Sequence, residues 1–210
     1  MDKLKTYGEI YDEEFLKKFG KYRDDVAKTK LEKEFEVDVK KIAELCNIEV
    51  IEEYLDVIEY PNEDEMDACK MMHSAPIVDF IEYVTDVENR KVKINSNRTE
   101  EVKRFNLAHE IGHILIGNLK IAENAKNNSF NKNLIKRLNE FNSSYFANEL
   151  LLPKVLLKRA LEDVMREYKY DPLQKFSEND VNLLTDKTAN LLNVPRELLR
   201  RRIDRLNVFN

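Results

Sequence analysis

The sequence is poor in cysteine, in glycine and in long apolar runs. Its 210 residues include 2 cysteines, too few for a disulfide framework, and only 4 glycines. No apolar run approaches the roughly 20 residues needed to cross a bilayer. The first residues, MDKLKTYGEIYDEEF, lack the apolar segment of a signal peptide. Taken together, these absences lead us to expect a protein of the reducing cytoplasm that does not enter a membrane.

The charge balance excludes further classes of protein. Charged residues make up 36% and hydrophobic residues 42% of the chain, which is typical of a folded, helix-rich protein. The net charge of −5 argues against a general nucleic-acid binder, so a DNA contact would have to come from a local basic patch. One candidate patch is an arginine cluster near the end of the chain, made of Arg196, Arg200, Arg201, Arg202 and Arg205. The alternative is a solvated helix face whose charge is offset by nearby acids.

The spacing of apolar residues predicts an α+β fold. Helices are expected at 9–35 (one or two), 37–46, 99–116, 137–152, 155–170 and 177–206 (two). Strands are expected at 48–55, 77–84 and 90–94, with a hairpin between the last two. Residues 60–75 are interpreted as loop or weak strand, and 120–136 as a long polar connection. We divide the chain into a domain of residues 1–153 and a helical C-terminal region of residues 154–210, which could contain a helix-turn-helix-like unit.

The most informative stretch is RFNLAHEIGHILIGN, which contains the HExxH motif His109–His113. Residues four apart lie on one face of a helix, so both imidazoles can reach one metal ion. Glu110 then projects beside the metal, where it can take a proton from water. These are the working parts of a zinc hydrolase. The alternative is a helix that contains the motif by chance.

A catalytic zinc site of this type needs a third protein ligand. In gluzincin-type sites that ligand is a glutamate from a second, downstream helix. Glu140 is the best candidate, because it heads a helical stripe of small residues that continues through Ser144 and Ala147. Together with Gly112 on the motif helix, such residues would let two helices approach closely. Glu149 is the rival ligand, and a solvated charge is the alternative role for Glu140.

Two segments of the chain resemble the ImmA/IrrE family of metallo-endopeptidases. They are R-F-N-L-A-H-E-I-G-H and the later E-F-N-S-S-Y-F-A-N-E-L-L-L-P. The resemblance covers roughly residues 37–206, most densely 92–153. It implies a zincin-like fold with a small antiparallel or mixed sheet, and a Zn²⁺ ion held by His109, His113 and Glu140. It also implies Glu110 as the catalytic base.

The chain departs from the family pattern at two places. Ser143-Ser144 replaces the usual Ala-Asn pair, whose second member could orient a zinc-bound histidine through a hydrogen bond. Pro195 replaces a serine near the end, a mild change at a helix start. For the donor that stabilises the oxyanion, the sequence offers only candidates, namely Tyr83, Tyr145 and His73. The strand at 90–95 is expected to be an edge that pairs with an extended substrate.

The resemblance implies a zinc endopeptidase that cleaves a helix-turn-helix repressor, often one of a mobile element or a stress regulon. The partner would therefore be a protein substrate, with a weak DNA contact through the arginine cluster as an added prediction. Two alternatives stay open. One is a regulatory binding protein that keeps the zinc fold without proteolysis, and the other is a toxin-like protease that acts on a host protein.

Overall fold

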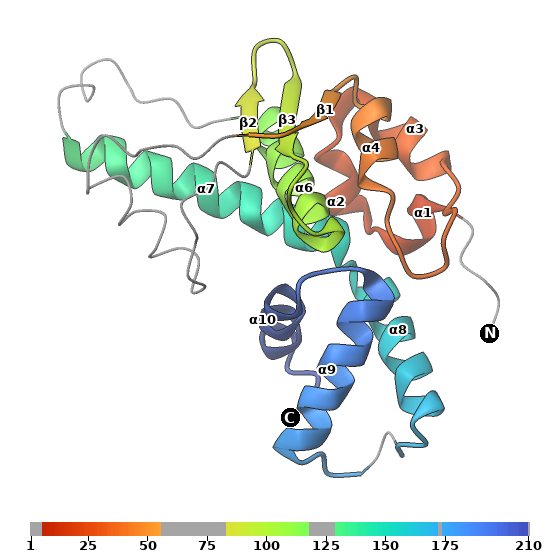
Figure 1. Ribbon diagram of the computed structural model, residues 1–210. Coiled ribbons are helices and arrows are strands. Elements are labelled where there is room, and N and C mark those ends of the chain that lie inside the picture. Colours follow the sequence, from red (N-terminus) through yellow and green to blue (C-terminus); the bar gives the residue numbers. More distant parts are fainter. Residues whose placement is uncertain (1–5, 56–82, 118–128, 172–173, 210) are drawn as a thin grey trace.

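The computed structural model describes residues 6–55, 83–117, 129–171 and 174–209. Its helices are α1 (Tyr7–Ile10), α2 (Glu13–Lys17), α3 (Arg23–Lys28), α4 (Val39–Leu45), α6 (Glu100–Ile116), α7 (Ser129–Leu151), α8 (Lys154–Glu167), α9 (Glu178–Leu192) and α10 (Arg196–Leu206). Its strands are β1 (Glu49–Glu53), β2 (Tyr83–Asp86) and β3 (Lys91–Asn95), and a 3-10 turn spans Gly20–Tyr22. The fold is therefore mixed α+β and mostly helical, as the sequence predicts (Figure 1).

The three described strands form a mixed sheet in the order β1-β3-β2. β2 and β3 are antiparallel, so the predicted hairpin is confirmed, and Arg90 takes a positive φ of 53° in its turn. The first strand of the hairpin extends to Asp86 and not to 84 as expected, and residues 77–82 of its predicted range lie outside the described residues. β1 pairs with β3 in parallel. The expectation of an edge strand at 90–95 is therefore wrong, because β3 is paired on both sides and buries Val92 and Ile94. Within the described sheet, β2 lies at the edge beside β3.

Helices α6 and α7 pack against each other near the middle of the molecule, with the sheet on one side of them and the first part of α7 projecting outward in Figure 1. Their close approach depends on Gly112 of α6. A Cβ atom at this position would lie 3.1 Å from the Cα of Ser143 and 3.2 Å from the Cβ of Phe146. Interiors are packed too tightly to absorb such contacts without movement. The predicted close contact through small residues is thus confirmed.

α7 begins earlier than the sequence predicts. The expected connection over 120–136 is wrong in its last part, since α7 starts at Ser129. Residues 132–138 are mostly exposed, so these two turns of helix have no buried apolar face to produce a clear periodic signal. The N-terminal helices are also shorter than expected, with Gly20 at a positive φ of 56° between α2 and α3.

Two arginines connect the central helices to the flanking ones. Arg104 of α6 donates to the carbonyl oxygen of Val37 at 2.7 Å and to that of Leu192, at the end of α9, at 3.0 Å. Arg202 of α10 is 2% exposed and makes a bidentate ion pair with Glu149 of α7 at 2.6 and 2.9 Å. A continuous core joins helices from both ends of the chain. The division at residue 153 stays a prediction.

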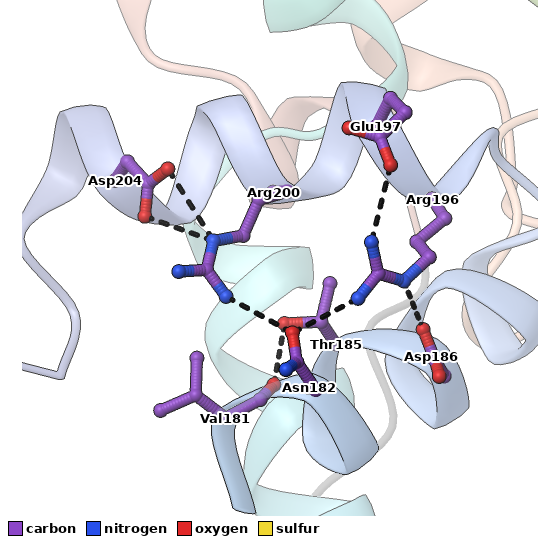
Figure 2. Close-up of polar contacts among 8 residues, drawn as sticks. All are labelled: Val181, Asn182, Thr185, Asp186, Arg196, Glu197, Arg200 and Asp204. Atoms are coloured by element: carbon purple, nitrogen blue, oxygen red, sulfur yellow. Dashed lines mark hydrogen bonds and ion pairs between the residues drawn. The ribbon is translucent and has the colours of Figure 1, made fainter. Parts of the chain in front are cut away.

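The arginine cluster of α10 is largely occupied by contacts within the protein. Figure 2 shows Arg196 paired with Asp186 and Glu197, and Arg200 paired with Asp204. The amide oxygen of Asn182 accepts a hydrogen bond from each of these two arginines, at 2.9 and 3.4 Å. This arrangement matches the alternative of a helix face offset by acids. Within the described residues, no helix is long and apolar enough to cross a membrane.

Candidate metal centre

Helix α6 carries the HExxH motif on its buried side. It begins after Thr99, has Glu100 and Glu101 in its first turn, and ends at Gly117, whose φ is 75°. Acids in a first turn interact favourably with the helix dipole, and glycine tolerates positive φ at a helix end. The predicted bounds of this helix are therefore confirmed. His109, Glu110 and His113 are all buried.

Helix α7 brings Glu140 to the two histidines. The Nε2 atom of His109 lies 3.1 Å from Oε2 of Glu140 and 3.1 Å from Nε2 of His113. The Nε2 atom of His113 lies 3.5 Å from Oε1 of Glu140. The rival candidate Glu149 is held instead by Arg202, as described above. The structure thus gathers a cluster of His109, His113 and Glu140 that could hold a metal ion.

The charge of Glu140 favours a cation at the cluster. Burial alone would raise the pKa of Glu140, but hydrogen bonds to His109 and His113 outweigh it and hold the pKa well below its usual range. The carboxylate is therefore ionised. A negatively charged oxygen facing two imidazole nitrogens is the type of donor set that zinc prefers.

Glu110 stands beside this cluster with an oxygen that lacks a partner. Its side chain is buried, and its Oε1 lies 3.9 Å from Nε2 of His109. Among the described residues, this oxygen has no hydrogen-bond partner. Burial raises the pKa of Glu110, while the nearby His109 lowers it. Burying a polar atom without a partner is costly, so the observation indicates that the oxygen serves something bound at the cluster.

Thr85 of β2 is a residue that the sequence analysis missed. It lies beside Glu110 and lowers the pKa of that carboxyl, without the geometry of a full hydrogen bond. Its Oγ1 is buried and also lacks a partner among the described residues. No sequence motif identifies Thr85, because only the pairing of β2 with β3 brings it to α6.

The hydroxyl of Ser144 contacts His109 at the ring nitrogen that faces away from the cluster. Its Oγ lies 3.2 Å from Nδ1 of His109, so the other ring nitrogen, Nε2, is directed to the cluster. Ser144 stands where the family pattern has an asparagine, and a hydrogen bond to a ligand histidine is what we expected of that position. Hydrogen bonds of this kind fix the tautomer and the orientation of a ligand histidine.

The three candidates for an oxyanion donor lie in different places. The ring of Tyr83 is 6.0 Å from that of His109, measured between centroids, so Tyr83 borders the site. Tyr145 has the ammonium of Lys18 and the guanidinium of Arg205 over its ring and lies on another side of α7 from Glu140. His73 lies outside the described residues.

A family comparison agrees with this geometry. The Peptidase M78 family model, described as an IrrE N-terminal-like domain, matches residues 76–204, which is more than half of the chain. The chain belongs to this family. The match confirms the resemblance that the two segments indicated and supports a peptidase of a metal-dependent family. No curated protein matches the sequence significantly.

The residues present fit a zinc ion. Ligand atoms about 2.0–2.1 Å from a tetrahedral zinc are roughly 3.3 Å apart. The separations of 3.1 to 3.5 Å between the candidate donors agree with that value. Two imidazoles and one carboxylate would leave a fourth ligand position of a tetrahedral zinc for water, and the Oε1 atom of Glu110 lies 3.9 Å from Nε2 of His109.

Proposed function

We propose that the protein is a zinc-dependent endopeptidase with one or a few protein substrates. His109, His113 and Glu140 would hold the zinc, and Glu110 would act as the general base. The observation that carries the proposal is the juxtaposition of a complete donor set with a buried carboxylate oxygen that has no partner among the described residues. Membership of the peptidase family supports the same conclusion.

Glu110 performs the proton transfers in this proposal. A zinc ion at the cluster would lower the pKa of water towards about 7 and polarise the peptide carbonyl. Glu110 takes a proton from the attacking water and passes it to the leaving amine. Its burial raises the pKa of the carboxyl, which makes the carboxylate a stronger base than an exposed glutamate. Ser144 keeps His109 oriented through Nδ1.

The substrate backbone would pair with β2. This strand lies at the edge of the described sheet, and Thr85 connects it to the position of Glu110. An extended peptide that adds to a sheet edge is bound through main-chain hydrogen bonds. The scissile bond would then lie close to both Glu110 and the zinc ligands. Tyr83, on the same strand, is the best-placed candidate for the oxyanion donor.

The family resemblance favours a helix-turn-helix repressor as the substrate, in the cytoplasm. The test is to express the wild-type protein and the Glu110→Gln variant in the same cells and to compare all new protein N-termini by mass spectrometry. A cleaved repressor that appears with the wild type alone supports the proposal. A cleaved host protein would indicate the toxin-like alternative. Identical N-termini in both samples, with zinc bound in both, would favour the non-proteolytic binding protein.

A DNA contact through the arginine cluster has little support in the geometry. Arg202 is buried against Glu149, and Arg196 and Arg200 are paired with acids. Arg205 lies over the ring of Tyr145. Phosphate binding depends on uncompensated cations. Among the described residues, Arg201 and Arg205 are the members of the cluster without a carboxylate partner, which is few for a DNA-binding surface. We therefore keep a protein substrate as the principal partner.

A further inference from the structure

Helix α7 carries an exposed apolar stripe on a different side from the metal centre. The stripe consists of Leu134, Leu138, Phe141 and Tyr145, which are 45%, 41%, 57% and 38% exposed. Their spacing of four, three and four residues places them in one row along the helix. The row is about 16 Å long, or three helical turns. Single exposed apolar residues are ordinary, but a continuous row of this length is typical of a contact surface.

The stripe lies next to the proposed active site without being part of it. Phe141 directly follows Glu140, so its side chain points about 100° further around the helix. Glu140 therefore faces the histidines while Phe141 faces away, and it is the most exposed member of the stripe. A protein bound along this row would be held within one helix diameter of the metal centre.

Cations border the stripe at both ends, although the whole chain is acidic. The carboxylate of Glu149 lies close enough to raise the pKa of the Tyr145 hydroxyl, but its charge is paired with Arg202. Arg137 is one helical turn from both Leu134 and Phe141 and is exposed. At the other end, Lys18 and Arg205 lie over the ring of Tyr145, at 4.9 and 5.6 Å from its centre. In the described part of the chain, none of these three cations has a carboxylate partner. An apolar row bordered by unpaired cations is complementary to an apolar row bordered by acids.

We propose that the stripe is a docking surface for an acidic amphipathic helix of a partner protein. The partner would place its apolar residues on Leu138 and Phe141 and its carboxylates near Arg137, Lys18 and Arg205. A helix in an apolar groove is a recurring mode of recognition, and charges at its border set the choice of partner. A second copy of this chain fits less well, because pairing two α7 helices would bring like charges together.

The test uses a labelled synthetic peptide of about three heptads, with leucine at the a and d positions and glutamate at the flanking positions. Its binding to the full-length, zinc-loaded Glu110→Gln protein is measured by fluorescence anisotropy, so that cleavage cannot interfere. We expect the peptide to bind at least about tenfold more tightly than the same peptide with lysine in place of glutamate. The affinity should also fall as salt is raised from about 0.05 to 0.3 M.

Variants of the stripe decide whether binding occurs there. The double variant Leu138→Ser/Phe141→Ser should weaken binding at least about tenfold, since central aromatic and aliphatic anchors dominate such contacts. Arg137→Glu should weaken binding and reduce its dependence on salt. The matched control is Val155→Ser on α8, which removes an equally exposed apolar side chain and should change nothing. Circular dichroism and zinc content verify that each variant is folded.

Three results would overturn the inference. The first is the absence of peptide binding, and the second is binding that the stripe variants leave unchanged. The third is sedimentation of the wild type as a dimer that the double variant converts to a monomer, which would make a second copy the occupant. The inference does not rest on the proposed peptidase function. If the protein cleaves its substrate but does not bind the peptide, the docking surface is refuted and the proposed peptidase function is not.

Discussion

Replacing Gly112 by alanine should weaken the contact between α6 and α7 and with it the metal centre. The added Cβ would lie 3.1 Å from the Cα of Ser143 and 3.2 Å from two atoms of Phe146. The first of these is a backbone atom, so the whole of α7 has to shift by a few tenths of an ångström. Because α7 carries Glu140, the shift also moves this carboxylate relative to His113.

Two opposing effects set the magnitude of this change. Alanine is about 0.8–1.0 kcal/mol better than glycine inside a helix, which favours the variant. Overpacking a tight interior typically costs about 1–3 kcal/mol, which disfavours it. Since one contact is with backbone, we place the overpacking cost in the upper part of that range. The expected net result is a protein destabilised by about 1–2 kcal/mol.

Urea unfolding of the metal-free protein measures this change, and competition with a chelator measures zinc affinity. We expect both to decrease in Gly112→Ala. Ile116→Ala on the same helix is the control, because Ile116 is exposed and its substitution adds no atom to the α6–α7 contact. A Gly112→Ala protein that is more stable than the wild type and binds zinc equally well would refute the reasoning. In that case helix propensity would outweigh packing, and the glycine would not set the distance between the helices.

Three further predictions concern the site and its support. We expect the wild-type chain and Glu149→Ala to bind about one zinc ion per chain and Glu140→Ala to lose it; metal analysis after dialysis that shows zinc kept by Glu140→Ala and lost by Glu149→Ala would contradict the proposed ligand set. Ser144→Ala should lower zinc affinity about tenfold or more while leaving the urea midpoint nearly unchanged, because it removes only the hydrogen bond to Nδ1 of His109. Arg202→Met should destabilise the protein by up to about 3 kcal/mol, because it leaves the partly buried carboxylate of Glu149, 15% exposed, without its charged partner. The double variant Arg202→Met/Glu149→Leu should recover much of that loss in the same unfolding assay. If its destabilisation instead equals the sum of those of the two single variants, the two side chains do not stabilise each other.

The HExxH helix and its bounds could be predicted because their signals are local. Periodicity, the acids of the first turn and the terminal Gly117 are all contained within one stretch of sequence. The same holds for the hairpin of β2 and β3. The central position of β3 could not be predicted in this way, since strand order depends on a parallel pairing with β1 some forty residues earlier. The start of α7 was missed for a different reason, because its first turns bury little apolar surface.

By itself, the sequence determined which residues are candidates for the chemistry of the site. Two histidines at helical spacing, a glutamate between them and a second glutamate heading a stripe of small residues indicate a candidate donor set and a candidate base before any fold is known. Only the tertiary structure decided which carboxylate lies with the two histidines, because Glu140 and Glu149 differ in their neighbours and not in their type. α7 turns Glu140 towards His109 and His113, and Arg202 holds Glu149 elsewhere. Thr85 likewise reaches Glu110 only through the pairing of β2 with β3, a contact between distant segments that no local pattern encodes.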